Sequence, residues 1–470
     1  MATIEVDTAI IGAGQAGVPL ARALTRAGQP VALVERDRLG GSCVNWGCTP
    51  SKAMIASSRL AAQARRAAEW GIRIPQVEVD FAAVMERARS MAAASRGSLE
   101  GSLPSQPNLR LVRAHARLEG REGERFRLRA GADVLLARQV VLDTGTRSAR
   151  PPLDGLDAVP ADRLIDAESW IERSVLPERA VFLGGGTIAL EMAQAWRRFG
   201  AAVTIVESGP RLAGRKDEEV SAELRAALEA EGVAVRCDAK AERVEATGEG
   251  GVRLHLDGGE ALAATHLFLA TGRLANTDDL GLGTVGVAPG KHGIVAVDER
   301  LRTGVPGLFA AGDIRGGGQF THTAYDDFRV LESLMLGDGS RTTERVLPYA
   351  VFTEPELGRV GMTEAEARHA GHRVLVGRQP MSESGKAREI GRTRSFIKVV
   401  AEAGSRRIFG AAALCDSGSE VVQLFIGLMN AGATADTMLD GVHIHPTLGE
   451  AAKNAVVALH EGRPPEETHA

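Results

Sequence analysis

Two of the chain's four cysteines stand close together in the segment GGSCVNWGCTPSK, residues 40–52. A pair at this spacing can hold a metal ion, form a structural disulfide, or form a disulfide that is repeatedly reduced and made again. Zinc commonly needs four ligands, and the sequence has no second Cys or His cluster of suitable spacing, which disfavours a metal site. Two unrelated buried thiols are a further alternative, but the flanking glycines and a predicted helix start favour a pair that is open to chemistry.

Cys48 stands at or just before the start of a predicted helix. Pro50 suits the first turn of a helix, and residues 51–70 are mostly strong helix formers. The helix dipole and the ammonium group of Lys52 would both stabilise a thiolate at Cys48. Because a redox-active cysteine requires such a thiolate, the pattern favours redox chemistry for this pair.

Two copies of a strand, a glycine-rich turn and a helix surround this pair in the sequence. Each copy predicts a βαβ unit that binds a dinucleotide, because the first glycine permits the bend, the second admits a pyrophosphate and the third allows close helix packing. The pyrophosphate then lies on the helix N-terminus. The first unit has Gly12, Gly14 and Gly17 in the turn and Glu35 at the end of the next strand, where it can bond a ribose.

The second unit has Gly184, Gly186 and Ala189 in the turn and Glu207 at the end of the next strand. A carboxylate at that strand end bonds a ribose 2′-hydroxyl and repels a 2′-phosphate, which predicts a preference for NADH over NADPH. Arg211 and Lys216 follow shortly after Glu207 and could meet a phosphate, so NADPH stays open as an alternative.

The length and the charge of the chain limit the classes of function that it can have. The chain has 470 residues, of which 44% are hydrophobic, enough for two to four domains. The net charge is −4 with both signs interspersed, so we expect small-molecule partners and neither nucleic acid nor an anionic membrane. No leader is recognised before the first strand and no apolar run reaches the length of a membrane span. We therefore expect a cytoplasmic location, where a purely structural disulfide is unusual.

The cysteine motif G-G-x-C-x-N-x-G-C-x-P-S-K follows a Rossmann unit and resembles that of the class I pyridine nucleotide-disulfide oxidoreductases. This family includes dihydrolipoamide dehydrogenase, glutathione reductase and mercuric reductase. The further matching segments are DTGTRS at residues 143–148, ATGRLAN at 270–276, LFAAGDI at 308–314 and HIHPTLGE at 443–450. The resemblance therefore covers nearly the whole chain.

The resemblance implies an α/β fold with two Rossmann-like dinucleotide-binding domains, for FAD and NAD(P), and a C-terminal α+β dimerisation domain. The expected parts are an FAD-binding domain over residues 1–149 with the cysteine pair, an NAD(P)-binding domain over 150–272, the second part of the FAD-binding or central domain over 273–341, and the dimerisation domain over 342–470. A homodimer is implied.

The family's site residues carry over onto matching positions of this sequence. The implied FAD contacts are Gly12, Gly14, Gly17, Glu35, Lys52, Thr144, Gly145, Asp313 and His322. The implied NAD contacts are Gly184, Gly186, Ala189, Glu207, Gly272 and Arg273. The implied catalytic residues are Cys43, Cys48, Lys52, Glu191, His445 and Glu450, with no metal ion.

The resemblance also implies a role for each catalytic residue. Hydride passes from NADH through FAD to the Cys43–Cys48 disulfide, and the electrons then pass to a small-molecule disulfide or another thiophilic oxidant. Cys48 contacts the flavin, and Cys43 attacks the substrate. Lys52 lies by the flavin N5 and pairs with Glu191. His445, held by Glu450, acts across the interface from the partner subunit and protonates the leaving thiolate.

Several positions depart from these relatives. The C-terminal residues RPPEETHA lack the vicinal cysteines of mercuric reductases, which disfavours mercuric ion as the physiological substrate. Residues 316–329 and 410–415 look closest to mercuric-reductase-like flavoenzymes that lack this pair, including those linked to reactive-chlorine resistance. Thr187 stands where glutathione reductase has a tyrosine lid, which predicts an open nicotinamide pocket. Cys237 and Cys415 are expected to be inert buried thiols, and His443 is expected to have a structural role.

Three alternatives stay open at this point. The chain could be a dihydrolipoamide dehydrogenase of a multienzyme complex, or a mercuric-reductase-like enzyme that reduces metal ions or quinones. A flavin-based redox sensor is the alternative that is not an enzyme. The sequence leaves open the electron acceptor and the roles of Trp46 and His322.

Overall fold

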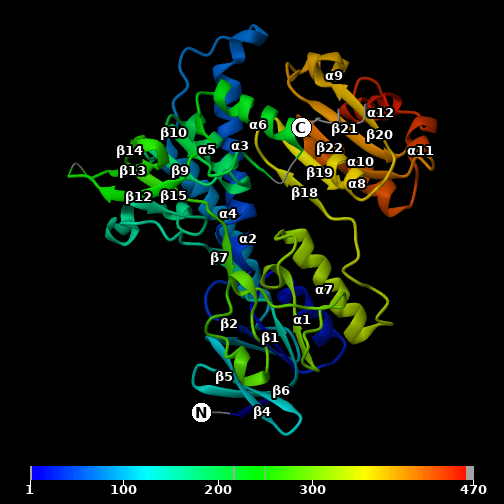
Figure 1. Cartoon of the computed structure of the whole chain (residues 1–470). Helices are drawn as coiled ribbons and strands as arrows, with labels where there is room; N and C mark the ends of the chain where they lie inside the picture. Colours follow the sequence, from blue (N-terminus) through cyan, green and yellow to red (C-terminus); the bar gives the residue numbers. More distant parts are fainter. Residues whose placement is uncertain (1–2, 215–216, 249, 462–470) are drawn as a thin grey trace, which may run out of the picture. The chain divides into compact units, whose positions relative to one another are not determined.

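The computed structural model describes residues 3–214, 217–248 and 250–461. These residues form two compact units (Figure 1). The first unit comprises Met1–Ala180, Arg243–Leu254 and Ala263–Arg345, and the second comprises Val181–Glu242, His255–Leu262 and Val346–Ala470. Each unit is described by itself below.

The first unit is built on a seven-stranded sheet with the order β3-β2-β1-β6-β5-β4, in which β17 also pairs with β6. Its strands are β1 (Thr3–Ile11), β2 (Val31–Glu35), β3 (Leu109–Arg113), β4 (Ala116–Glu122), β5 (Arg125–Ala130), β6 (Asp133–Leu142) and β17 (Leu308–Ala310). β1 pairs in parallel with both β2 and β6, and β17 pairs in parallel with β6. The carboxyl ends of these parallel strands therefore lie along one edge, where ligands bind in open α/β sheets.

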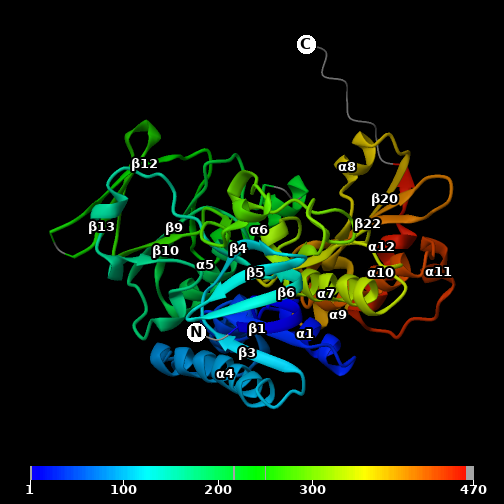
Figure 2. The same ribbon diagram turned by 90° about the horizontal axis from the view of Figure 1, so that it is seen from below.

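Within the described residues, five α-helices belong to this unit. They are α1 (Gly17–Arg26), α2 (Gly41–Asn45), α3 (Cys48–Arg65), α4 (Phe81–Ser102) and α7 (Thr321–Leu336). Figures 1 and 2 both show α1 beside α7, and a shared core joins Leu20 and Leu24 of α1 to Phe328 and Leu331 of α7. The apolar face of α1 recurs at helical spacing, which explains why this short segment packs as a helix.

Short strand pairs complete the first unit. β7 (Thr146–Ser148) pairs antiparallel with β16 (Arg273–Ala275), and β8 (Leu164–Ile165) pairs in parallel with β15 (His266–Leu269). The pairing of β7 with β16 brings the matched segments 143–148 and 270–276 together, although they are far apart in the sequence.

The second glycine turn lies between β9 (Arg179–Leu183) and α5 (Thr187–Phe199), followed by β10 (Ala202–Val206), α6 (Glu218–Ala230) and β11 (Ala234–Arg236). Here β10 pairs in parallel with β11. A three-stranded sheet is formed by β12 (Ala241–Ala246), β13 (Val252–Leu256) and β14 (Ala261–Ala264). This is the arrangement that the second glycine motif predicts.

The C-terminal part of the second unit is a six-stranded sheet with the order β18-β19-β22-β21-β20-β23. Its strands are β18 (Pro348–Val351), β19 (Glu356–Gly361), β20 (Val374–Pro380), β21 (Phe396–Glu402), β22 (Ile408–Cys415) and β23 (His460–Glu461). The helices are α8 (Glu364–His369), α9 (Gly385–Glu389), α10 (Gly418–Asn430), α11 (Ala435–Asp440) and α12 (Leu448–Val457). Neighbouring strands are antiparallel. The α/β fold with an antiparallel C-terminal domain is thus confirmed.

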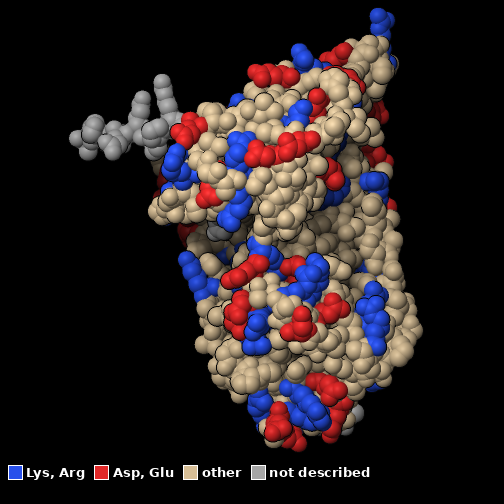
Figure 3. Space-filling view, turned by 90° about the vertical axis from the view of Figure 1, so that its right-hand side faces the viewer, with Lys and Arg blue, Asp and Glu red and all other residues tan. Residues whose placement is uncertain are grey.

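Lys, Arg, Asp and Glu side chains are interspersed over the face shown in Figure 3. Among the described residues, no helix combines the length and apolar character needed to cross a membrane.

Candidate active site

Cys43 and Cys48 lie on two consecutive helices of the first unit. Cys43 is in α2, and Cys48 is the first residue of α3. Gly47 lies between the helices, and a Cβ at this position would come within 2.9 Å of the carbonyl oxygen of Ser42 and 3.2 Å of Cys43 Cα. Glycine is therefore required for the close approach of the two helices. The predicted helix start is confirmed, because α3 begins at Cys48.

The two sulfurs form an electrostatically linked pair. A hydrogen bond to Cys48, burial of Cys43 and the charge of Cys48 together raise the pKa of the Cys43 thiol far above its ordinary value. The Thr321 hydroxyl and the Lys52 ammonium act in the opposite direction. The neighbouring sulfur and burial therefore disfavour negative charge on Cys43, while Thr321 and Lys52 favour it.

Thr321 contacts this pair from α7. Its Oγ1 lies 3.3 Å from the sulfur of Cys48, at the first residue of the helix. Sequence reasoning did not single out Thr321, because 273 residues separate it from Cys48. The next residue, His322, stacks its ring on Phe320 with a centroid distance of 5.3 Å and an interplanar angle of 8°. The predicted contact of His322 with FAD stays a prediction.

A buried amide fixes the conformation of α2. The Nδ2 of Asn45 donates to the carbonyl oxygens of Leu39 and Gly41 at 3.0 and 2.9 Å, and its Oδ1 accepts from Arg96 at 3.0 Å. Trp46 contributes through its carbonyl oxygen, which accepts from the indole Nε1 of Trp170 at 2.9 Å. These bonds assign Asn45 and Trp46 structural roles in positioning Cys43.

The first glycine turn leaves no room for side chains. A Cβ at Gly12, whose φ is +105°, would lie 2.2 Å from the carbonyl oxygen of Asp143, and a Cβ at Gly17 would lie 2.2 Å from that of Gly12. The carboxylate of Glu35 accepts from the N–H groups of Ala13 and Asp37 at 2.9 and 2.8 Å. This cradle, followed by the N-terminus of α1, fits a dinucleotide such as FAD.

Thr144, Gly145 and Asp313, three further predicted FAD contacts, follow the carboxyl ends of β6 and β17 in the same sheet. Thr144 donates its hydroxyl to the carbonyl oxygen of Asn276 at 2.9 Å, and Gly145 has a φ of +64°. Asp313 accepts from the hydroxyl of Thr146 at 3.1 Å, and burial raises the pKa of the Asp313 carboxyl while Arg273 opposes the rise.

The second turn repeats the geometry of the first. Gly184 has a φ of +106°, and its N–H donates to Val206 at 2.8 Å, as Gly12 donates to Val34 at 2.8 Å. The carboxylate of Glu207 accepts from the N–H groups of Gly185 and Gly209, both at 2.7 Å.

Two further residues of the second turn lie at the start of α5. Ala189 is fully buried at the third turn position. Gly186 precedes α5, which Thr187 begins. Arg211 is half-buried nearby in the sequence, and Lys216 lies outside the described residues.

Arg273 and Glu191 each make hydrogen bonds within their own unit that differ from the contacts predicted for them. Arg273, which follows Gly272 at a φ of +127°, donates to the hydroxyl and carbonyl oxygens of Thr146 at 2.7 and 2.9 Å. Its role toward the nicotinamide nucleotide stays a prediction. Glu191 is buried and accepts from the N–H of Phe352 at 2.9 Å, and its pairing with Lys52 stays a prediction.

His445 and Glu450 form the predicted pair in the second unit. The Nδ1 of His445 lies 2.8 Å from Glu450 Oε2, and the imidazole is largely exposed. The Thr447 hydroxyl accepts the Glu450 N–H at 3.1 Å and thereby starts α12. A carboxylate on Nδ1 leaves Nε2 as the ring atom that exchanges a proton with a substrate. The Nε2 of His443 lies 2.9 Å from the carbonyl oxygen of Met438, a contact that fits a structural role.

The other two cysteines differ in burial. Cys415 is buried in β22, and burial raises the pKa of its thiol. Cys237 is half-buried and so more accessible than expected, although burial raises its pKa as well. Within the described part of the chain, no group of three or more His, Cys, Asp or Glu side chains could hold a metal ion.

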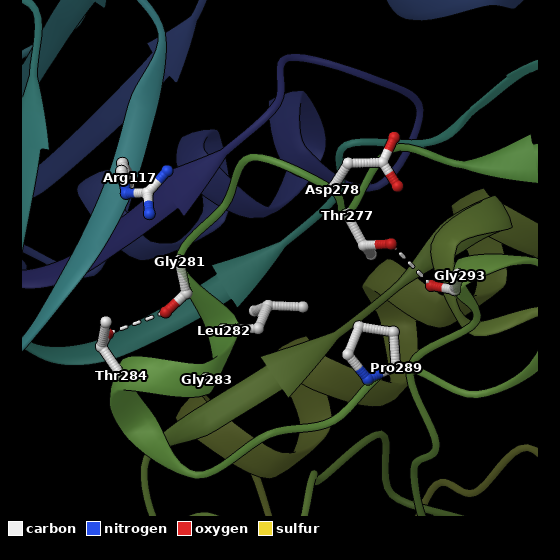
Figure 4. Close-up of a pocket in the computed structure, with 9 residues that line it drawn as sticks. All are labelled: Arg117, Thr277, Asp278, Gly281, Leu282, Gly283, Thr284, Pro289 and Gly293. Carbon is white, nitrogen blue, oxygen red and sulfur yellow. Dashed lines mark hydrogen bonds between the residues drawn. The ribbon is translucent and has the colours of Figure 1, made fainter.

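A surface pocket of about 520 Å³ opens in the first unit, between β4 and the 3₁₀ turn over Leu282–Val285 (Figure 4). Arg117, Asp278, Leu282 and Pro289 are among its lining residues. None of the predicted site residues lines it.

With this geometry in place, comparison with known proteins identifies the family. Residues 6–327 match the pyridine nucleotide-disulphide oxidoreductase family, and residues 347–456 match the dimerisation domain of that family. The chain therefore belongs to the pyridine nucleotide-disulphide oxidoreductases, whose members use FAD and NAD(P)H, and it contains their dimerisation domain.

Two curated relatives align over almost the whole chain. Dihydrolipoyl dehydrogenase of Geobacillus stearothermophilus is 31% identical over 459 residues, with 97% of each chain covered. The probable pyridine nucleotide-disulfide oxidoreductase RclA of Escherichia coli strain K12 is 30% identical, covering 95% of this chain and 97% of that one. A solved Cu(II) complex of the Escherichia coli HOCl-induced flavoprotein disulfide reductase RclA superposes with a TM-score of 0.87 at 29% identity, covering 96% and 99% of the two chains. The predicted family resemblance is confirmed.

Proposed function

We propose that this protein is a homodimeric NAD(P)H-dependent reductase of a small-molecule disulfide or another thiophilic oxidant, with NADH as the preferred donor. The observation that carries the proposal is the sulfur pair itself, because Cys43 and Cys48 lie on consecutive helices and their side chains share a hydrogen bond. A pair that stores one thiol and one thiolate is the two-electron-reduced form of a disulfide.

FAD bound at the first turn and a nicotinamide nucleotide bound at the second would supply the electron pair that opens the Cys43–Cys48 disulfide. Two electrons and one proton convert this disulfide into a thiol at Cys43 and a thiolate at Cys48. The Cys43 sulfur, once deprotonated, attacks one sulfur of the substrate disulfide and forms a mixed disulfide, while the other substrate sulfur leaves as a thiolate. Cys48 then attacks the Cys43 sulfur, restores the protein disulfide and releases the second substrate thiolate.

Exposure alone does not assign these roles, since Cys48 is the more exposed of the two residues. The assignment of Cys43 to the substrate rests on the family resemblance. His445 of the partner subunit is proposed to accept the Cys43 proton and return it to the first leaving thiolate. Glu450 supports this role, because its carboxylate lies 2.8 Å from Nδ1 and stabilises the imidazolium.

NADH preference is supported by the position of Glu207. Its carboxylate is held against the second glycine turn by the N–H groups of Gly185 and Gly209, at the strand end where a ribose is recognised. A 2′-phosphate at this place would meet a fixed negative charge, whereas a 2′-hydroxyl could donate to it.

Dihydrolipoyl dehydrogenase activity is the second candidate, because a protein of that name is 31% identical over 97% of both chains. The likeness to RclA, which was solved as a Cu(II) complex, favours testing metal ions as well. A steady-state screen of the full-length protein distinguishes these functions. It would offer NADH and NADPH with lipoamide, glutathione disulfide, other small disulfides, Cu(II), Hg(II) and quinones.

Sustained NADH consumption with a small disulfide supports the proposal, and the fastest turnover with lipoamide would assign the second candidate. Consumption with quinones alone would show electron transfer that bypasses the sulfur pair. A single round of reduction without turnover on any acceptor would contradict the proposal and indicate a redox sensor.

A further inference from the structure

The first glycine turn contains a buried carboxyl group that the family motif did not assign. Asp143, at the end of β6, is 7% exposed and packs beneath the turn. Its Oδ2 accepts the N–H of Gly17 at 2.7 Å. A Cβ at Gly14 would come 2.7 Å from the same oxygen, so the side chain fills the space that these glycines leave.

The N–H groups that bond Asp143 are those at the start of α1. Gly17 is the first residue of that helix, Ala16 precedes it, and the N–H of each stabilises the charged form of the carboxyl. The same N–H groups and the helix dipole attract the pyrophosphate of a bound dinucleotide. Asp143 and a pyrophosphate therefore compete for one positive electrostatic site.

Two further carboxyl groups act on the charge of Asp143. Asp313 and Asp327 both face it and repel its charge. Asp327 is neutralised by Arg315, at 2.6 and 2.8 Å, and by Arg345 at 2.6 Å. Arg273 acts on Asp313. Burial, the largest influence, raises the pKa of the Asp143 carboxyl well above its ordinary value.

We propose that Asp143 couples FAD binding to the uptake of one proton, because a pyrophosphate in the first glycine turn favours the neutral form of its carboxyl. Neutral Asp143 still accepts the Gly17 N–H through its carbonyl oxygen, so the turn keeps its shape. An ionised Asp143 repels the doubly charged pyrophosphate in a buried, weakly screened place. The inference rests on the proposed use of the first turn for FAD.

The sign of the pH dependence follows from this competition. Bound FAD raises the pKa of Asp143 further, so protons are taken up between the free-state and bound-state pKa values. Within that interval the dissociation constant of FAD rises by about tenfold for each unit of pH. Below the interval Asp143 is neutral in both states, and above it Asp143 is ionised in both, so the dependence on Asp143 vanishes.

FAD binding to the full-length apoprotein, measured by quenching of FAD fluorescence from acidic to alkaline pH, tests this inference. The affinity of the wild type for FAD should fall as the pH rises. Asp143→Asn keeps a hydrogen-bond acceptor for the Gly17 N–H, and its FAD affinity should lose this pH dependence. At alkaline pH this variant should bind FAD more tightly than the wild type. Asp80→Asn is the matched control, because Asp80 also accepts an N–H at a helix start, from Ala83 at 2.9 Å, but is exposed. The FAD affinity of Asp80→Asn should show the same pH dependence as that of the wild type.

Calorimetry on the wild type in two buffers of different ionisation enthalpy gives a second readout that needs no variant. It should show close to one proton taken up per FAD within the interval, and Asp143→Asn should lose that proton. Equal pH slopes for wild type and Asp143→Asn, or no proton uptake by the wild type, would overturn the inference. Failure to bind FAD at any pH would overturn it together with the assignment of the first turn. The measurements use no disulfide and no nicotinamide nucleotide, so failure of disulfide turnover leaves their result standing.

Discussion

The hydroxyl oxygen of Thr321 lies 3.3 Å from the sulfur of Cys48, which joins the first residue of α7 to the first residue of α3. The same hydroxyl lowers the pKa of Cys43, against the larger influences of Cys48 and burial. Thr321 is therefore a positioning residue that stabilises negative charge on the sulfur pair.

Loss of this hydroxyl should make the reduced pair less acidic. A neutral hydrogen bond contributes about 1 kcal/mol, which corresponds to roughly 0.7 pKa unit. We expect Thr321→Val to shift the pH dependence of thiol alkylation upward by about this amount, and Thr321→Ser to preserve the wild-type profile. Rates of iodoacetamide labelling of the reduced protein, read by mass spectrometry at Cys43 and Cys48, measure the shift.

Thr323→Val is the matched control for this shift. Thr323 is on the same helix and buried, and its hydroxyl has no hydrogen-bond partner among the described residues. It should leave the alkylation profile unchanged. An identical profile for Thr321→Val and the wild type would show that the hydroxyl does not act on the sulfurs.

The His445–Glu450 pair predicts separate effects on the two half-reactions. His445→Gln should slow disulfide turnover by about 10²- to 10⁴-fold, the range for removal of a general acid or base. Reduction of the protein by NAD(P)H should stay near the wild-type rate, because it precedes substrate attack. Since the pKa of Cys43 is raised, residual turnover in this variant should increase with pH, as hydroxide replaces the base.

Stopped-flow measurement of both half-reactions checks this separation. Glu450→Gln should cause a smaller loss than His445→Gln, because the imidazole remains but its charged form loses a carboxylate partner. His443→Gln is the control and should keep wild-type turnover. Equal slowing of both half-reactions in His445→Gln would point to a structural defect in place of acid-base catalysis.

Glu207 predicts the choice between the two nicotinamide nucleotides. Removing its charge in Glu207→Gln should raise the ratio of kcat/KM for NADPH to that for NADH by at least tenfold, on the order of 1.4 kcal/mol, because the 2′-phosphate no longer meets a carboxylate. Glu242→Gln, at an exposed position of the second unit, should leave the ratio unchanged. A ratio unaffected by Glu207→Gln would remove Glu207 from nucleotide discrimination.

The elements that carry the site could be predicted because their signals are local. Gly12 and Gly184 have the positive φ that their turns require, and the helix that starts at Cys48 follows from Pro50 and the helix formers after it. His445 and Glu450 could be paired in advance because they lie five residues apart at the start of one helix.

The features that sequence reasoning missed depend on the order of strands in a sheet. Asp143 reaches Gly17 across 126 residues because β6 lies beside β1, and Thr321 reaches Cys48 across 273 residues. Arg273 bonds Thr146 because β16 pairs with β7. No local pattern encodes these neighbours. The aspartate in the segment DTGTRS was the one available signal, since a carboxyl at the end of a buried strand needs hydrogen-bond partners.

Steady-state turnover of Cys43→Ser with a disulfide that the wild type reduces tests whether electrons reach the substrate through the Cys43–Cys48 pair. Cys237→Ser serves as the control, and FAD content is matched by absorbance. Cys43→Ser should lose at least 10³-fold in disulfide turnover, as expected for removal of a nucleophile, while Cys237→Ser should retain the wild-type rate. Disulfide turnover by Cys43→Ser within tenfold of the wild type would show that electrons reach the substrate without this pair.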